Sequence, residues 1–280
     1  MNVVQFSVEP LLRVAQAFPG TPRIMAELSA LLRDPNAELE AITRHLKHDS
    51  ALAARLLRVA NSAAFAQSEP IGSIEEAAAL IGFQEIHRVV GAVAVDQFSR
   101  CHYPLYGFDG PRLRANAIFV ALLMEELAHP AREDPETAYT TGLFRSLGKL
   151  ALEKLAEDGE AVAAFRPDHD PDLVHWERQG FGISGNEATA VVLQHWHFPA
   201  EVAQAITLHF TPGRDDPRLA HLLHLAAGMA DHLGYGLPGE RRYWIADDNA
   251  FLRAGINPAK SKRYIDRATI AFDRLNRAIG

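Results

Sequence analysis

Helical periodicity is the feature of this sequence that most restricts its fold. The stretch 39–49 places apolar residues at the i, i+3, i+7 spacing of one helix face, and the stretch 51–62 repeats the pattern. Ser73 and Glu76 form a capping box that begins another helix, and Gly82 is a natural helix end. No segment shows the period-2 alternation of a half-buried strand. We therefore predict an all-α protein built as a multi-helix bundle.

The remaining helical patterns suggest two packed helical subdomains. We expect helices at 84–98, 112–129, 135–156, 184–198, 199–210 and 217–233, followed by a closing amphipathic helix within 261–279. Residues 101–111 are rich in Pro, Gly and aromatic side chains and interrupt the pattern. This predicts an N-terminal subdomain at 1–105, a second at 106–235, and a closing loop and helix at 236–280.

Composition excludes several classes of protein. The net charge of −7 does not favour binding driven by nucleic-acid phosphates, so we expect no nucleic-acid partner. Cys101 is the single cysteine, which excludes an intrachain disulfide framework and a CxxC-type zinc site. The sequence has neither a signal-peptide pattern nor a run of about 20 apolar residues. We therefore expect a cytoplasmic protein without a membrane partner.

Two groups of motifs carry a family resemblance. HDSALAARLLRVANSAAF followed by IGSIEEAAALIGFQEIHRVV resembles the N-terminal half of the HDOD family. The motifs AYTTGLFRSLGKLAL, WERQGFGISGNEA, LQHWHFPAEVAQAITLHF and LAHLLHLAAGMAD follow in the order of that family's second half. The resemblance covers about residues 18–235. It implies a bacterial regulatory domain related to the HD and HD-GYP metal-dependent phosphohydrolases, with a second, HD-like subdomain.

The resemblance also indicates where the metal ligands of catalytic relatives would fall. In chain order these positions are Ala115 or Asn116, Arg145 and Ser146 in place of His-Asp, Asn186, His209 with Phe210, and Ala227 with Asp231 one turn later. Only His209 keeps a ligand side chain. A catalytic metal needs at least three His or carboxylate ligands, and Arg145 puts a fixed positive charge in the ligand set. We therefore expect no metal, no cofactor and no catalytic residue.

The other candidate chemical sites are two histidine pairs and the single cysteine. His221 and His224 share a helix face, and His195 and His197 flank Trp196, so either pair is compatible with metal ligation, although 13 histidines produce such pairs by chance. Cys101 lies beside His102, but adjacent residues rarely adopt nucleophile–base geometry. The sequence has no GxSxG, P-loop or GxGxxG motif.

Two surfaces remain as candidate recognition sites. The first is the vestigial pocket, with Asn116, Arg145, Ser146, Asn186 and His209, which has the chemistry to bind an anionic nucleotide without cleaving it. The second is a corner formed by Arg55, Arg58, Asn61 and Ser62, at which Asn61 and Ser62 either fix the following turn or meet a partner or the second subdomain.

The function that we expect is non-catalytic. The chain would be a bacterial signal-transduction module that recognises protein partners, with a nucleotide second messenger as a further candidate ligand. Outside the resemblance it carries no receiver, kinase or cyclase domain, so we expect its signal to come from another protein or a small ligand, through a shift of subdomains about residues 101–111. The alternatives are a residual metal-dependent phosphodiesterase or phosphohydrolase, and a nucleotide sensor that uses the vestigial pocket.

Overall fold

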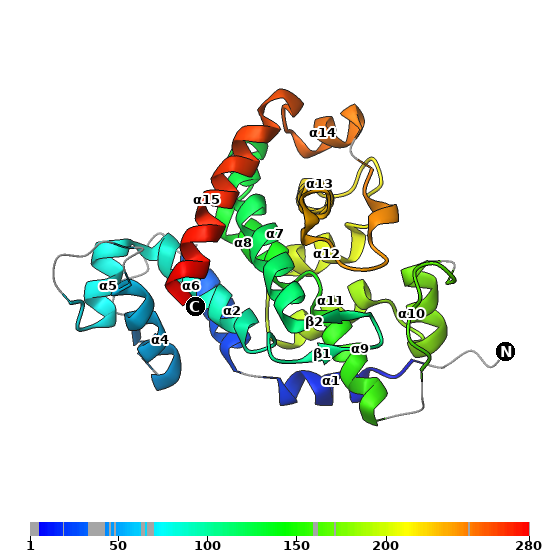
Figure 1. Ribbon diagram of the computed structural model, residues 1–280, viewed down its shortest axis with the longest axis horizontal. Helices are drawn as coiled ribbons and strands as arrows, with labels where there is room; N and C mark the ends of the chain where they lie inside the picture. Colours follow the sequence, from blue (N-terminus) through cyan, green and yellow to red (C-terminus); the bar gives the residue numbers. More distant parts are fainter. Residues whose placement is uncertain are drawn as a thin grey trace.

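The computed structural model is built almost entirely of helices (Figure 1). It describes residues 6–18, 20–32, 43–44, 46–47, 49–62, 65, 70–158, 162–170, 172–245 and 247–279. The N-terminal helices are α1 (Val8–Ala17), α2 (Thr21–Leu32), α4 (Ser50–Ala60), α5 (Ile74–Ile81) and α6 (Phe83–Asp96). The prediction of an all-α protein is confirmed; most of the helix predicted at 39–49 lies outside the described residues.

The second half begins with a feature that periodicity did not predict. Strands β1 (His102–Tyr103) and β2 (Phe108–Asp109) pair as a small antiparallel hairpin in the Pro- and Gly-rich interruption. The helices that follow are α7 (Gly110–Ala131), α8 (Pro135–Phe144), α9 (Leu147–Asp158), α10 (Leu173–Phe181), α11 (Gly185–His195), α12 (Ala200–Leu208), α13 (Arg218–Ala230), α14 (Asp248–Ala254) and α15 (Ser261–Ile279).

Local capping explains several of these helix ends. Ser184 and Glu187 form the complete capping box at the start of α11. At α5 the Ser73 hydroxyl accepts a hydrogen bond from the Glu76 amide, and Gly82 ends the helix with φ of 81°. The positive φ explains why glycine stands at that position.

Helix α7 is the central helix of the second half. Helices α8, α13 and α15 all pack against it, and its middle turns are fully buried. Gly142 of α8 allows the closest approach, because a Cβ atom there would lie 2.8 Å from the Cα of Ala121. The two helix backbones are therefore held in close contact at the centre of the core.

The first and last described helices pack against helices that lie far from them in the sequence. Helix α1 contacts α9 and α11, while α15 contacts α7 and α4 (Figure 1). A single cluster of buried apolar residues extends from Leu11 to Ala278. The subdomain boundaries given above remain a prediction.

Among the described residues, no single helix has both the length and the apolar composition of a membrane span. Only α5 and α6 taken together, across a bend of 117°, meet those criteria.

Candidate functional site

The expected helix at 135–156 is divided in two at Arg145 and Ser146. Helix α8 ends at Phe144 and α9 begins at Leu147. Thr189 of α11 accounts for the break, because its hydroxyl oxygen accepts from the Gly148 amide at 2.8 Å and lies 3.4 Å from the Arg145 carbonyl. A side chain from another helix thus replaces a backbone bond of a continuous helix.

Arg145 lies at this junction and points into the protein. It is 2% exposed, and its Nη2 donates to Asn116 Oδ1 at 2.7 Å and to Glu240 Oε2 at 2.8 Å. Asn116 lies on α7 and in turn donates to the Tyr235 carbonyl at 2.7 Å. The guanidinium therefore joins α7 to the segment that follows α13.

Lys149, one turn along α9, extends this buried charge cluster. Its ammonium nitrogen lies 3.1 Å from Glu240 Oε1 and 4.0 Å from Glu177 Oε1. Glu177 also accepts from the Tyr106 hydroxyl at 3.1 Å and from the Gly185 amide at 2.7 Å. Two cations and two carboxylates thus share one enclosed space, and we call Arg145, Lys149, Glu177 and Glu240 the buried ionic cluster.

The pKa values of the two carboxylates in the cluster shift in opposite directions. Burial tends to raise the pKa of Glu240, but the Arg145 and Lys149 charges outweigh it and lower this pKa to about 2. Burial dominates at Glu177 and raises its pKa, although the Lys149 charge opposes the shift. Glu240 is therefore the ionised partner of the two cations at neutral pH.

His209 lies beside the cluster as a neutral side chain. Its Nδ1 donates to the Ile206 carbonyl at 2.6 Å, which leaves Nε2 as the acceptor nitrogen, buried and without a partner among the described residues. Burial first, and then the Arg145 charge, lower its pKa to about 3. The Trp244 ring covers this region, 5.9 Å from the His209 ring and 5.8 Å from the Arg145 guanidinium.

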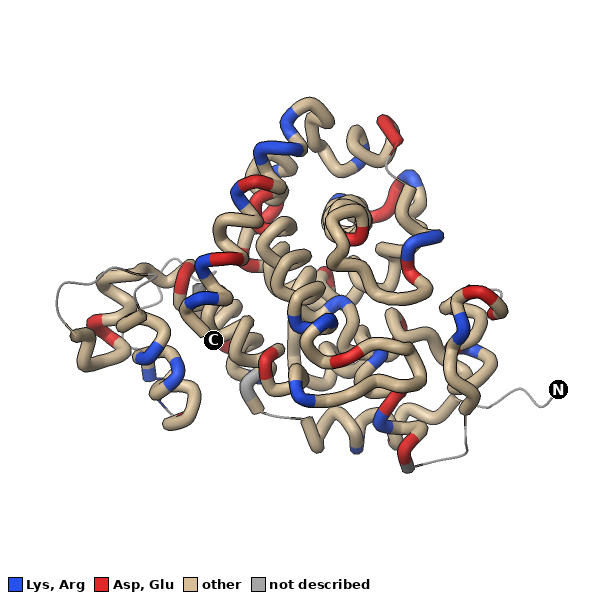
Figure 2. Tube along the Cα trace, in the orientation of Figure 1, with Lys and Arg blue, Asp and Glu red and all other residues tan. Residues whose placement is uncertain are grey.

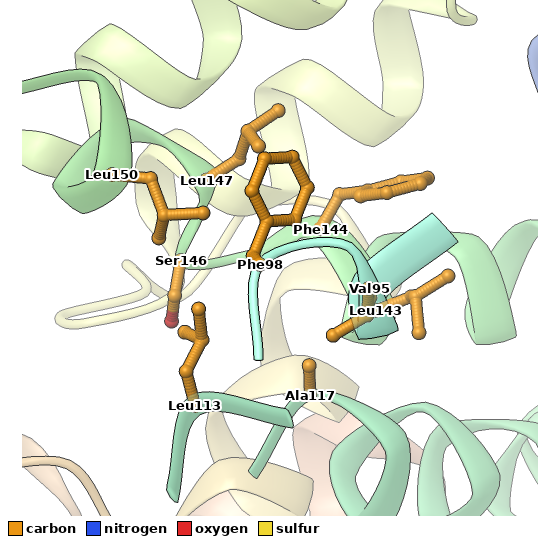
Figure 3. Close-up of a pocket in the computed structure, with 9 residues that line it drawn as sticks. All are labelled: Val95, Phe98, Leu113, Ala117, Leu143, Phe144, Ser146, Leu147 and Leu150. Carbon is orange, nitrogen blue, oxygen red and sulfur yellow. The ribbon is translucent and has the colours of Figure 1, made fainter. Parts of the chain in front are cut away.

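Two of the predicted pocket residues lie elsewhere. Ser146 lines a small apolar pocket between α6, α7 and the α8–α9 junction, where Figure 3 shows it with Leu113, Leu150 and other apolar side chains. Asn186 is buried in the first turn of α11, and its side chain makes no hydrogen bond to any described residue. The structure thus brings together Asn116, Arg145 and His209, but not Ser146 or Asn186.

The family resemblance places the metal ligands of catalytic relatives at positions whose residues here do not fit a catalytic metal. The His209 Nε2 lone pair is free, but Arg145 and Asn116 lie where further ligands would be needed, and Ala227 has no donor. Asp231 contacts the following segment instead, with Oδ2 lying 3.8 Å from Arg241 Nε. Within the described part of the chain no group of three or more His, Cys, Asp or Glu side chains could hold a metal ion.

The alternative histidine pairs are also engaged or separated. His224 donates from Nδ1 to the His209 carbonyl at 2.9 Å, and its Nε2 lies 3.3 Å from the Ile245 amide. Both of its ring nitrogens are therefore used, which removes His224 as a ligand beside His221. His197 is exposed and has a positive φ of 62°, while His195 ends α11.

The corner at the end of α4 is partly internal. Arg55 forms an ion pair with Asp96 of α6, which also pairs with Arg114 of α7 at 3.1 Å. Asn61 donates to the Ile71 carbonyl and accepts from the Ile71 amide, at 2.9 and 2.7 Å.

These contacts link the N-terminal helices to the central helix α7 and fix the turn that follows α4. Arg58 is exposed, whereas the Ser62 hydroxyl is buried without a partner among the described residues.

Glu240 is the main residue of the site that sequence reasoning missed. It lies in the region predicted as a closing loop and helix, 236–280, and it is fully buried. The only local signal was the spacing of Arg145 and Lys149 four residues apart, which places two cations near one another without indicating their partner.

The helical fold and this buried site define an HD-like helical domain. The HDOD domain model matches residues 18–212, and the chain belongs to the HDOD family. A search of curated proteins found no match.

Solved structures share the fold. A Shewanella amazonensis protein named "Putative phosphohydrolase" is 27% identical, with a TM-score of 0.70 and coverage of 97% of this chain and 98% of that chain. A Marinobacter aquaeolei protein named "Putative signal transduction protein" is 22% identical, with a TM-score of 0.72 and coverage of 92% and 58%. A Geobacter sulfurreducens "HDOD domain protein with unknown function" is 19% identical, with a TM-score of 0.64 and coverage of 96% and 99%.

Proposed function

We propose that this protein is a non-catalytic regulatory module of bacterial signal transduction that acts by recognising protein partners in the cytoplasm. The observation that carries the proposal is the buried ion pair between Arg145 and Glu240. It occupies the position at which the family resemblance places the His-Asp metal ligands of catalytic relatives. The HD-like fold is then a scaffold whose surfaces are free to serve recognition.

The ion pair argues against a residual hydrolase on physical grounds. A divalent cation would lie beside the fixed charge of Arg145, and Glu240 is already neutralised by two cations. Removing one partner from a buried charge pair leaves an uncompensated charge and costs about 3–5 kcal/mol. Metal binding at this place would therefore have to disrupt ion pairs whose side chains are at most 3% exposed.

The same contacts bear on the nucleotide-sensor alternative. Arg145 and Lys149 are the cations that an anionic ligand of the vestigial pocket would need, but the side chains of both are at most 3% exposed. A nucleotide would have to displace Glu240 and the Trp244 ring to reach them. Protein recognition at the surface requires no such rearrangement.

A hydrolysis assay tests the proposal. Untagged protein is equilibrated with Mn²⁺, Fe²⁺ or Zn²⁺ and assayed with bis(p-nitrophenyl) phosphate, cyclic dinucleotides and guanosine polyphosphates, beside His209→Gln prepared identically. We expect turnover no higher than in the metal-only blank for both proteins. Turnover that exceeds the blank and is lost in His209→Gln would show a working active site and overturn the proposal.

A further inference from the structure

A second cavity lies beside the buried ionic cluster, on the outer side of Phe210. It has a volume of about 330 Å³ and opens between the segment 210–212 after α12, the first two turns of α13, the segment 242–245 and α14. Small-molecule sites begin at about this size. Of the positions at which the resemblance places metal ligands, only Phe210 lines this cavity.

Phe210 forms the partition between the two places. The Lys149 ammonium of the cluster lies 5.5 Å from its ring centroid, while the Tyr243 ring stacks on it at 4.4 Å with an interplanar angle of 7°. His224 reinforces the same wall through its hydrogen bond to the His209 backbone. The cavity therefore has a rigid aromatic wall held by buried contacts.

One buried polar side chain in the cavity lining has an unused nitrogen. His221 is 3% exposed, and its Nε2 has no hydrogen-bond partner among the described residues. Burial first, and then the nearby Arg253 charge, lower the pKa of His221. His221 is therefore a neutral side chain that lies close to Arg253. An unpaired buried nitrogen is costly unless a bound group satisfies it.

Two arginines supply positive charge at the mouth of the cavity. Arg242 and Arg253 line it, are exposed, and have no acidic side chain within ion-pair distance in the described part of the chain. The only carboxylate in the lining is Asp247, which accepts from the Ala250 amide at 2.8 Å as the N-cap of α14. The charge of the lining is therefore net positive in a protein of net charge −7.

We propose that this cavity binds a small phosphorylated metabolite of the size of a nucleoside diphosphate, with its phosphates on Arg242 and Arg253, a hydroxyl group on the neutral His221 and its organic part against Tyr243 and Ile245. Guanidinium forks match phosphate oxygens in geometry and charge. Tyr243 and Ile245 supply apolar surface at the same opening, and Ile245 is 64% exposed. The inference adds a ligand to the proposed regulatory module and does not depend on the absence of catalysis.

Isothermal titration of the full chain with adenosine diphosphate, inorganic pyrophosphate and adenosine tests the site. The variants are Arg253→Gln and His221→Gln, and the matched control is Arg241→Gln, an exposed arginine next to Arg242 that does not line the cavity. We expect saturable binding of adenosine diphosphate with a dissociation constant below 1 mM, weaker binding of pyrophosphate, and none of adenosine.

The variants decide whether binding occurs at this place. Losing the charge-assisted contact should weaken adenosine diphosphate binding about tenfold or more in Arg253→Gln. Losing the neutral hydrogen bond should weaken it about threefold or more in His221→Gln, with less than a twofold change in Arg241→Gln. Arg253 is exposed, so its substitution leaves folding intact even if His221→Gln does not. No saturable binding, or equal weakening in the control, would overturn the proposal. Neither result alters the hydrolysis test above.

Discussion

The guanidinium of Arg145 donates to the carboxylate of Glu240 at 2.8 Å, and each of the two side chains is 1% exposed. The two residues are 95 positions apart in the sequence. Their pairing joins the α8–α9 junction to the segment after α13. It places two charged groups in the interior of the HD-like half. Basic and acidic residues are otherwise interspersed along the chain (Figure 2).

Glu240→Gln should destabilise the protein more than Arg145→Met does. Without the Glu240 charge, Arg145 and Lys149 face each other with only Glu177 nearby, whereas Arg145→Met leaves Glu240 paired with Lys149. We expect a loss of about 3–5 kcal/mol in the free energy of unfolding for Glu240→Gln, measured by urea denaturation. The control is Glu157→Gln, in an exposed pair with Lys154, which should cost at most about 1 kcal/mol. Equal costs in the two Glu variants would contradict the role of the buried pair.

His87 should make the protein less stable in mild acid. Burial lowers its folded-state pKa to about 4, below the ordinary value of 6.5. Between about pH 4 and pH 6.5, His87 therefore binds more protons in the unfolded chain than in the folded protein. The contribution to stability is full above about pH 6.5 and is lost as the pH falls to about 4, with a slope of about 1.4 kcal/mol per pH unit.

The variant His87→Gln should flatten this pH dependence, whatever its effect on stability at pH 7. Denaturation midpoints measured from pH 4 to pH 7.5 provide the comparison, with exposed His169→Gln as the control that keeps the wild-type slope. A His87→Gln curve parallel to the wild type would show that His87 is not the buried neutral group described here.

Gly148→Ala should disturb the contact between α9 and α11. A Cβ atom at position 148 would overlap the Gly185 carbonyl oxygen and lie 2.6 Å from the Thr189 amide nitrogen. Overpacking of this kind costs about 1–3 kcal/mol or more, because a backbone must move. Thermal unfolding measures the effect, and Gly20→Ala, where nothing lies within 4 Å of the new atom, is the matched control. Unchanged melting temperatures in both variants would contradict the close helix contact.

Asn61→Ala should loosen the turn that follows α4. The Asn61 amide exchanges two hydrogen bonds with Ile71 and donates a third contact to the Leu57 carbonyl at 2.9 Å. Losing this bridge should cost about 1–3 kcal/mol in the free energy of unfolding. Arg58→Ala, on the exposed face of the same helix, should change it by no more than about 0.5 kcal/mol. Comparable effects of the two substitutions would indicate that Asn61 does not hold the turn.

The features that could be predicted from the sequence are those that depend on local chemistry. The capping box at Ser184, the helix end at Gly82 and the long closing helix α15 depend on residues within a few positions of one another. The all-α class followed from the same periodicity. Helices α1, α2, α10 and α14 were not predicted. The two-residue strands were not predicted either, because so few residues show no period.

The composition of the site was harder to predict. The resemblance predicted Asn116, Arg145 and His209 as parts of one pocket; in the structure Arg145 donates to Asn116, and its charge lowers the pKa of His209. It could not identify Glu240, which lies beyond the matched region and reaches Arg145 only through the fold. The break at Ser146 likewise depends on Thr189, which is 41 positions from Gly148 and 44 from Arg145, and so has no local signal.

The central claim is that Arg145 and Glu240 have replaced a metal site. The most direct measurement is the metal content of untagged protein by plasma mass spectrometry, after equilibration with Mn²⁺, Fe²⁺ and Zn²⁺ and removal of free ions. The account predicts less than about 0.1 transition-metal ion per chain, because one imidazole cannot hold a catalytic metal. About one ion per chain in the wild type, lost in His209→Gln, would contradict it.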